Sequence, residues 1–344
     1  MKALIYDNGR IHLGERPIPE ILDEKDAIVK VTLSSICTSD LHIIKGFVPQ
    51  AKNNIVLGHE FVGEVVATGS AVKNISIGDR VSANCETFCG ECYFCKRGWV
   101  NNCLNGGWEL GCKIDGCQAE YVRVPYANNG LTKLPDNVSY KNALFVGDIL
   151  SSGYFGAEMS EVKQGDTIAI IGAGSVGMCA MLCAKYFGAK QIIAIDIDQT
   201  RLDIAKREHL CDYAFNPTNC DINQEIKGLT ENRGVDGVIE CAGTNETFQL
   251  AWQIARPNAI VGIVAMYETN QILPLPERYG KNLTFKTGGV DATHCAELLQ
   301  LIEKQEFSTD FLITHTFPFD KIIDAYKFFE NKPSGSLKIA IEYP

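Results

Sequence analysis

The chain has 344 residues, of which 46% are hydrophobic and 22% are charged, proportions that are ordinary for a globular protein with two domains. The formal net charge is −10, from 42 acidic and 32 basic residues. Because no basic block interrupts this acidic excess, we expect neither nucleic acid nor an anionic membrane surface as a partner.

The first part of the chain, up to about residue 150, reads as short strands separated by turns. Its opening residues contain no apolar core of signal-peptide length, and no later stretch reads as a membrane span. Runs rich in β-branched and apolar residues occupy 27–33, 60–68 and 120–124, with turn signals such as Gly78-Asp79 between them. This pattern predicts a β-rich first domain.

Within this region a compact run of four cysteines follows the pattern C-x2-C-x2-C-x7-C, at Cys89, Cys92, Cys95 and Cys103. Short spacers let one loop wrap four thiolates around a single ion, and an all-sulfur tetrahedral shell suits zinc held for structure. Two alternatives stay open, namely a pair of disulfides and four unrelated thiols. An iron–sulfur cluster is disfavoured because its usual spacing and trailing proline are missing.

The chain has 14 cysteines in all. Without a secretion signal, thiols and metal ligands are favoured over disulfides, so we expect a reducing compartment and place the protein in the cytoplasm. The cysteines outside the four-residue run lack ligand spacing and are expected to be reduced packing residues. Cys179 and Cys183, four positions apart on a predicted helix, are expected in the core.

From about residue 165 the pattern changes to alternating strands and helices. Strands are predicted at 167–171, 191–195, 237–240 and 259–264, and helices at 175–187 and 200–208. This alternation is typical of an α/β domain with a doubly wound parallel sheet. Helical segments at 292–306 and 319–330 and a final strand at 337–341 complete the chain.

A glycine motif of the form G-x-G-x-x-G, at Gly172, Gly174 and Gly177, follows the first of these strands and opens a helix. Its three glycines permit a tight turn, a close backbone approach to a pyrophosphate, and close packing of helix on strand. Backbone N–H groups at the helix start, around Ser175 and Val176, would then face the phosphates. The alternative is a structural turn that binds no ligand.

Asp196 ends the next strand, 19 positions after the last glycine of the motif. A carboxylate there accepts hydrogen bonds from a ribose 2′-hydroxyl and repels a 2′-phosphate, so the sequence favours NAD over NADP. Arg201 complicates this prediction, because it could flank the adenosine ribose and tolerate a phosphate. Its other interpretation is a surface residue in the first turn of the following helix.

Two earlier segments carry further metal-binding chemistry, C-T-S-D-L-H at 37–42 and G-H-E at 58–60. Taken singly, a cysteine or histidine such as Cys37 or His59 is more often a packing residue than a metal ligand. Together with the cysteine run and the glycine motif, however, these segments stand in the order found in zinc-dependent medium-chain alcohol dehydrogenases. The sequence resembles that family over nearly its whole length.

The resemblance implies a GroES-like catalytic domain at 1–152, with its zinc lobe at about 85–112, and a Rossmann NAD-binding domain at 153–290. Residues 291–344 would return to the catalytic domain, and the active site would lie in the cleft between the domains. It also implies two zinc ions per chain, one structural and one catalytic, the latter bound by Cys37 and His59 with one position open for substrate oxygen.

The third catalytic ligand departs from the cysteine that many family members use. The matching segment offers Asp148, which resembles the arrangement in bacterial secondary alcohol dehydrogenases. Glu60 is a competing ligand, and Asp148 has a second interpretation as a helix N-cap. Some members of that subgroup lack the cysteine lobe and bind NADP, whereas this sequence keeps the lobe and has Asp196.

The resemblance also implies a proton path, in which Ser39 takes the proton of the substrate alcohol and passes it through the cofactor ribose to His42. The alternative for His42 is a capped surface imidazole. Asp40 is expected to hydrogen-bond His59 and fix its tautomer. Thr38 is expected to contact the cofactor and Lys338 the pyrophosphate, although a strand lysine is more often solvated.

Trp108 and Tyr267 match the substrate-pocket region of the secondary alcohol subgroup. The function expected is therefore NAD-dependent, zinc-dependent oxidation of a secondary alcohol, or reduction of the matching ketone, by a homo-oligomer of two or four chains. A polyol, threonine-like or other hydroxy-compound dehydrogenase of the same family is the alternative. A non-catalytic nucleotide-binding or redox-sensing protein is the alternative from a different class.

Overall fold

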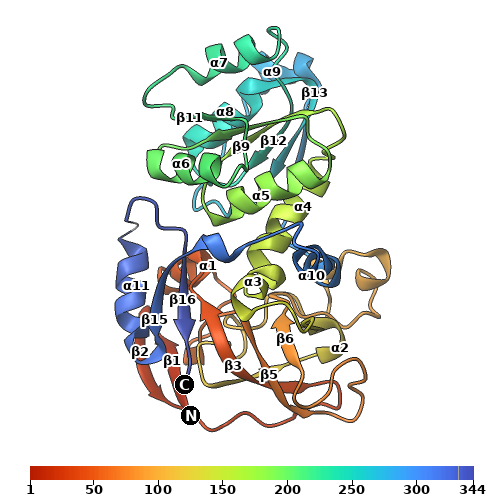
Figure 1. Cartoon of the computed structure of the whole chain (residues 1–344), viewed down its shortest axis with the longest axis vertical. Helices are drawn as coiled ribbons and strands as arrows, with labels where there is room; N and C mark the ends of the chain where they lie inside the picture. The colour runs from red at the N-terminus through yellow and green to blue at the C-terminus, as the bar shows by residue number, and fades with distance from the viewer. Residues whose placement is uncertain (332) are drawn as a thin grey trace. The chain divides into compact units, whose positions relative to one another are not determined.

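The computed structural model describes residues 1–331 and 333–344, and these divide into two compact units. Unit 1 comprises Met1–Ser151 and Asp291–Pro344, and unit 2 comprises Ser152–Val290. Figure 1 shows the consequence for unit 1, in which the red N-terminal and the blue C-terminal segments build one body. None of the described helices is long and apolar enough to cross a membrane.

Unit 1 is built mainly from strands. Its strands are β1 (Lys2–Asp7), β2 (Arg10–Glu15), β3 (Ala27–Ser35), β4 (Ile55–Val56), β5 (Phe61–Thr68), β6 (Arg80–Ala83), β7 (Tyr121–Val124), β8 (Leu131–Lys133), β15 (Ile313–Pro318) and β16 (Lys338–Glu342). Its helices are α1 (Thr38–Ile44), α2 (Ala127–Gly130), α3 (Tyr140–Ala143), α10 (Cys295–Glu303) and α11 (Ile322–Glu330). The β-rich character predicted for the first 150 residues is confirmed.

Strand β3 organises the larger sheet of unit 1. It pairs antiparallel with β5 and β7, and its far end pairs antiparallel with β16, Ser35 opposite Ala340. Segments separated by some three hundred residues of sequence therefore lie side by side, as the red and blue arrows in Figure 1 show. Residues Val29, Val31 and Leu33 on one face of β3 are buried, as the period of two requires for a half-buried strand.

Unit 2 contains, among the described residues, a six-stranded parallel sheet in the order β11-β10-β9-β12-β13-β14. In chain order this is 3-2-1-4-5-6, the order of a doubly wound dinucleotide-binding sheet, so the predicted fold is confirmed. The strands are β9 (Thr167–Ile171), β10 (Gln191–Ile195), β11 (Tyr213–Phe215), β12 (Val235–Glu240), β13 (Ala255–Ile263) and β14 (Thr284–Thr287). The helices are α4 (Ser151–Met159), α5 (Ser175–Tyr186), α6 (Gln199–Arg207), α7 (Ile222–Leu229), α8 (Asn245–Ile254) and α9 (Leu275–Arg278).

The central strand β9 shows why this sequence forms a parallel sheet. Residues 168–171 are all buried, because helices cover both faces of such a sheet and leave no polar side to the strand. Helix α5 begins at Ser175 and buries Cys179 and Cys183, as expected from their spacing. The order of β9 and β12 makes the carboxyl end of β9 the switch point at which such folds bind ligands.

Candidate active site and metal centres

The four cysteines of the lobe converge on one point. The Sγ atoms of Cys92 and Cys95 lie 3.5 Å apart, those of Cys89 and Cys103 lie 3.6 Å apart, and two further pairs lie 4.0 Å apart. Zinc–sulfur bonds of about 2.3 Å put the corners of a tetrahedron about 3.8 Å apart. The thiols therefore fit one tetrahedral ion, and as all are free cysteines the disulfide alternative is not what the structure contains.

Backbone donors surround the lobe's sulfur atoms. The N–H groups of Cys89 and Asn105 point to Cys103 Sγ, at 3.3 and 3.4 Å, and the N–H of Leu104 lies 3.5 Å from Cys92 Sγ. Hydrogen bonds from the backbone of Cys95 and Leu104 lower the pKa of Cys92 to about 6. These donors stabilise negative sulfur, as a closed thiolate shell requires.

A second set of potential ligands brings together Cys37, His59, Glu60 and Asp148, with one ligand atom from each within 4.8 Å of the others. Asp148 Oδ2 lies 3.3 Å from His59 Nε2 and 3.7 Å from Cys37 Sγ. Zinc bonds to nitrogen and oxygen are about 2.0–2.2 Å long, so tetrahedral neighbours of this composition are separated by about 3.4–3.6 Å. The sequence-predicted ligands therefore fit a single zinc ion.

Helix α1 presents three of the predicted residues from its first turns. Cys37 stands at its N-cap, where the Cys37 N–H donates to Asp40 Oδ2 at 3.0 Å. Ser39 follows, and its Oγ lies 3.3 Å from His59 Nε2. His42 lies three positions further on and is buried beside Phe47, rather than being a surface imidazole. Thr38, at the helix start, is exposed.

His59 uses its two ring nitrogens differently. Nε2 faces Asp148 and Ser39, whereas Nδ1 lies 3.7 Å from Asp40 Oδ1. Both Nδ1 and this Oδ1 are buried without a hydrogen-bond partner, and Asp40 is 0% exposed. The predicted bond between Asp40 and His59 is thus aligned but longer than a hydrogen bond. A ligand that takes up Nε2 leaves Nδ1–H to face the Asp40 carboxylate.

Asp148 is presented by a π-helical turn, Val146–Leu150, that precedes α4. A Cβ placed on Gly147 would lie 1.7 Å from the carbonyl oxygen of Ala83, so only glycine lets this turn approach the end of β6. The Cys85 N–H donates to the Gly147 carbonyl at 3.0 Å and fixes the approach. Single π-turns are frequent at functional sites, because they redirect one side chain.

The negative groups of this cluster favour the binding of a cation. Burial works against a charged imidazole, but hydrogen bonds to Asp148 and Cys37 outweigh it and raise the pKa of His59 well above its usual value. Burial likewise acts to raise the pKa of Asp148, but the bond to His59 lowers it below the usual range. Without a metal, a proton between the two groups supplies the positive charge. Metal binding displaces such a proton.

Glu60 forms an ion pair with Lys338, which lies near the end of the chain. Lys338 is 2% exposed, and its Nζ lies 2.5 Å from Glu60 Oε2 and 3.3 Å from the Ile36 carbonyl oxygen. Ser35 also donates to this Oε2, while Glu60 Oε1 is buried without a partner. Burial opposes the charge of Lys338, but Glu60 outweighs it and raises the pKa of the amine. The amine expected on the pyrophosphate is therefore engaged inside unit 1.

In unit 2 the glycine motif forms the turn between β9 and α5. Gly172 has a φ of 97°, and a Cβ on Gly177 would lie 1.8 Å from the Gly172 carbonyl oxygen. These two positions therefore need glycine. Gly174 is different, because a Cβ there would meet nothing within 4 Å. Its open side, next to the N–H groups of Ser175 and Val176 at the start of α5, leaves room for a phosphate to approach.

Asp196 lies at the end of β10 and is anchored to this turn. Its Oδ2 accepts a hydrogen bond of 2.6 Å from the Ala173 N–H, and its Oδ1 accepts one of 2.8 Å from Asp198. Arg201 lies 3.7 Å from the Asp198 carboxylate on the first turn of α6. The carboxylate therefore stands beside the glycine turn, and Arg201 is held by a neighbouring aspartate.

The two residues predicted for the substrate pocket lie in different units. Trp108 is in unit 1, where its ring meets that of His59 edge-on at 5.7 Å. Tyr267 is in unit 2, where its hydroxyl donates to Glu240 Oε2 at 2.7 Å. The structure thus places Trp108 against a predicted metal ligand and gives the Tyr267 hydroxyl a buried carboxylate partner.

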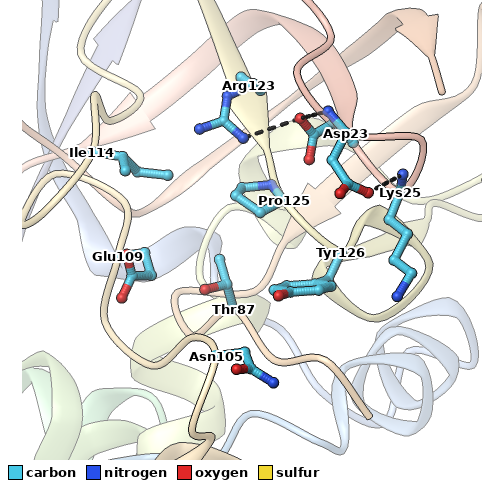
Figure 2. A pocket seen from close by; sticks show the side chains of 10 residues that line it. Asp23, Lys25, Thr87, Asn105, Glu109, Ile114, Arg123, Pro125 and Tyr126 are labelled. Atoms are coloured by element: carbon cyan, nitrogen blue, oxygen red, sulfur yellow. Dashed lines mark hydrogen bonds and ion pairs between the residues drawn. The ribbon is translucent and has the colours of Figure 1, made fainter. Parts of the chain in front are cut away.

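A cavity lies beside the cysteine lobe, apart from the Cys37 cluster. Figure 2 shows Thr87, Glu109 and Tyr126 lining it, with Arg123 near its rim. Arg123 is held by an ion pair of 3.1 Å to the buried Asp26. None of the predicted catalytic residues lines this cavity.

Comparison with known proteins agrees with the fold and the residue clusters. A family model described as the alcohol dehydrogenase GroES-like domain matches residues 23–136, and one described as zinc-binding dehydrogenase matches residues 175–304. An alcohol dehydrogenase of Cupriavidus necator is 36% identical over 367 residues, which span 99% of this chain and 98% of that protein.

Two further similarities extend this result. The NADP-dependent isopropanol dehydrogenase of Thermoanaerobacter brockii is 31% identical and covers 94% of both chains. Among solved structures, the alcohol dehydrogenase TADH from Thermus sp. ATN1 matches with a TM-score of 0.92 at 33% identity, and the match covers 100% of both chains.

The chain therefore belongs to the zinc-dependent medium-chain alcohol dehydrogenase family. It is an oxidoreductase that acts on an alcohol and uses zinc and a nicotinamide cofactor, with a GroES-like domain and a Rossmann domain. The family and activity inferred from the order of the sequence motifs are confirmed.

Proposed function

We propose that this enzyme interconverts a secondary alcohol and its ketone with NAD, using a catalytic zinc bound by Cys37, His59 and Asp148. The observation that carries the proposal is the convergence of one sulfur, one nitrogen and one oxygen ligand in a single buried cluster. A thiolate and a carboxylate neutralise the ion and leave a position for the substrate oxygen. Glu60 is the fourth, exchangeable ligand candidate, through its unpartnered Oε1.

When bound, the zinc supplies Lewis acidity that lowers the pKa of the alcohol, and the nicotinamide accepts the hydride. The chain's own residues handle the proton. Ser39 Oγ, close to His59 Nε2, is positioned to accept the proton of the alcohol. His42, on the same face of α1, is the next acceptor, because imidazole titrates near neutral pH. Asp40 holds the His59 ring by its Nδ1 side.

A second zinc, held by Cys89, Cys92, Cys95 and Cys103, is proposed to serve structure alone. The four sulfurs complete a tetrahedron and leave no position for substrate. The backbone N–H groups around them donate hydrogen bonds to the sulfur atoms. The expected metal content of the enzyme is thus two zinc ions per chain.

The role proposed for Lys338 is neutralisation of Glu60, in place of the pyrophosphate contact that the sequence suggested. Its buried amine neutralises Glu60 and so keeps that carboxylate from adding a further full negative charge to the metal site. Thr38 is exposed at the start of α1 and remains a cofactor-contact candidate. All fourteen cysteines are free, which supports a reducing compartment, and we propose the cytoplasm. A homodimer or homotetramer is proposed by resemblance to the family.

The proposal is tested with purified enzyme, butan-2-ol and NAD, while absorbance of the reduced cofactor is recorded. Turnover should disappear when a chelator removes the more exchangeable zinc and return when zinc is restored. Undiminished turnover in protein shown to be metal-free by elemental analysis would contradict the zinc mechanism.

The proposed choice of NAD depends on Asp196, which accepts a hydrogen bond from Ala173 in the glycine turn. Asp196→Gly should weaken NAD binding by about 10-fold or more and leave NADP binding equal or stronger, because one hydrogen-bonding carboxylate is lost and one repulsion is relieved. The measurement is kcat/KM for both cofactors. An unchanged ratio would contradict the role of Asp196 at the ribose. Arg201→Ala tests, by the same measurement, whether this arginine favours NADP.

A further inference from the structure

Glu86 and Trp108 lie on either side of a short antiparallel bridge near the Cys37 cluster. Thr87 and Gly107 form an isolated antiparallel bridge, with N–H···O distances of 3.0 and 2.7 Å. Glu86 precedes Thr87 and Trp108 follows Gly107, so the bridge brings the two residues into the same neighbourhood. The carboxylate of Glu86 reaches over Gly107, since a Cβ placed there would lie 3.8 Å from Glu86 Oε2.

The residues at this bridge have different surroundings. Thr87 and Glu109 line the cavity of Figure 2, whereas Glu86 and Trp108 are not among its lining residues. Trp108 instead packs its ring against His59. Burial raises the pKa of Glu86 to about 8, the Asp148 charge adds to the rise and His59 opposes it, so the carboxyl lies within electrostatic reach of both.

Both side chains carry a buried polar atom that no group of the described protein satisfies, Oε2 of Glu86 and Nε1 of Trp108. One is a carboxyl oxygen and the other an indole N–H donor, and the two are not bonded to each other. Buried polar atoms normally find a partner, because leaving one unpaired costs free energy. Two such atoms next to a catalytic cluster indicate a partner that arrives with the substrate.

A hydroxyl group is the ligand that satisfies both atoms. It donates to a carboxylate oxygen and accepts from an indole N–H at the same time. Above pH 8, where Glu86 is ionised, an ammonium group would leave the indole donor unpaired, a carbonyl would leave the carboxylate unpaired, and a carboxylate would be repelled by Glu86. A simple alkyl substituent would leave both unpaired.

We propose that Glu86 and Trp108 bind a second hydroxyl group of the substrate, so that the enzyme acts on diols or other polyhydroxylated secondary alcohols. The inference rests on the proposed function, since it names the substrate class of the same site. The reacting hydroxyl belongs to the Cys37–His59–Asp148 cluster, and the neighbouring one belongs to this pair. Glu86 and Trp108 are substrate-binding residues and take no part in the proton transfer.

The test compares kcat/KM for butane-2,3-diol and butan-2-ol, which share one carbon skeleton, in the zinc-loaded enzyme with NAD. The wild-type enzyme should prefer the diol by about 30-fold or more, because a site built for a hydroxyl rejects the analogue that lacks it. Glu86→Leu should abolish this preference by lowering the value for the diol and leaving that for butan-2-ol equal or higher. Trp108→Phe, which keeps the ring and removes the N–H, should reduce the preference about 5-fold or more.

Glu109→Gln is the matched control, because it removes a carboxylate that lies close to the same bridge, lines the cavity of Figure 2 and pairs with Lys113 at 2.8 Å. It should leave the diol preference unchanged. A second readout is independent of turnover: Glu86→Leu should raise the melting temperature by roughly 2–6 °C, since it removes an unpaired buried carboxyl. If that variant fails to fold, Glu86→Gln and Trp108→Phe carry the same comparison.

The outcomes separate the inference from the function on which it rests. Turnover of both alcohols with no preference for the diol, or equal loss for both in Glu86→Leu, would overturn the hydroxyl site and leave the alcohol dehydrogenase intact. A preference for 3-aminobutan-2-ol over the diol would also overturn it. Absence of turnover with either alcohol in zinc-loaded wild-type enzyme would instead count against the proposed secondary alcohol activity.

Discussion

The two metal-ligand clusters of unit 1 differ in how the chain builds them. The lobe draws its four sulfurs from a single loop, Cys89 to Cys103, and surrounds them with backbone N–H groups of that loop. The other cluster gathers Cys37, His59 and Asp148 from the start of a helix, the end of a short loop and a π-helical turn. The first is a local assembly, whereas the second exists only when distant segments have packed.

The difference extends to charge. The lobe holds four like ligands, with backbone N–H groups and the Asn105 side chain as hydrogen-bond donors to sulfur. The Cys37 cluster mixes a thiol, an imidazole and carboxylates, and balances Glu60 with the buried amine of Lys338. A closed local shell suits a structural ion, and a buried, mixed and partly compensated shell suits a site that must exchange ligands during catalysis.

The largest expected effect comes from removing the sulfur ligand of the mixed cluster. Cys37→Ser should lower kcat about a thousandfold or more, because the metal contributes several kcal/mol to stabilising the reacting oxygen. Zinc content should fall by one equivalent while the melting temperature changes little. Elemental analysis and steady-state rates measure both quantities, and retained activity with normal zinc content would exclude Cys37 as a ligand.

The corresponding change in the lobe should act on stability instead. Cys103→Ala should also release one zinc, and since structural zinc contributes about 10 kcal/mol or more to folding in small sites, the lobe should lose its order. Hydrogen exchange in residues 85–112 should become fast, and kcat per folded, zinc-loaded active site should stay within about threefold, a range that corresponds to less than 1 kcal/mol. A selective collapse of kcat in a well-ordered lobe would break the distinction between the two clusters.

The compensation of Glu60 can be tested by removing its partner. Lys338→Met leaves a buried carboxylate without a cation and should destabilise the protein by about 3–5 kcal/mol, measured by denaturant unfolding. Adding Glu60→Gln should restore most of the loss, because the double variant contains neither buried charge. Additive losses in the double variant would show that the two residues do not act as a pair.

The smallest effect concerns the chemistry of the lobe just after its zinc has been removed, before the loop loses its order. The pKa of Cys92 is about 6, below that of an ordinary thiol, so above pH 6 this sulfur is mostly thiolate. Alkylation of Cys92 by iodoacetamide should be constant at pH 7 and above and fall about tenfold per pH unit below 6, since protonation removes the nucleophile. Peptide mapping gives the rates, with Cys95 as the control, because burial raises its pKa to about 12. Equal labelling of both thiols at pH 7 would contradict the proposed backbone stabilisation.

Features set by adjacent residues were predictable from the sequence. The glycine motif and the apolar runs around it predicted β9, α5 and β10 within about a residue, because their signals lie inside the elements themselves. The cysteine run was equally local. Asp148 needed the resemblance to a known family, since an aspartate just before a helix also fits an N-cap, and no local pattern marks a π-helical turn.

The sequence could not predict contacts that depend on tertiary pairing. Lys338 looked like a strand lysine at the cofactor, but the antiparallel pairing of β16 with β3 carries it to Glu60. Glu86 gave no signal in the sequence, because its closeness to Trp108 depends on the bridge between Thr87 and Gly107.

The place of β16 in the chain also has a consequence for biosynthesis. Translation delivers Cys37, His59 and Asp148 early, then the whole of unit 2, and only afterwards the strand that carries Lys338. A nascent polypeptide that stops short of β16 has an uncovered edge on β3 and a Glu60 without its ammonium partner. We therefore expect the Rossmann half to mature while still attached to the ribosome, and the catalytic ion to be loaded after release.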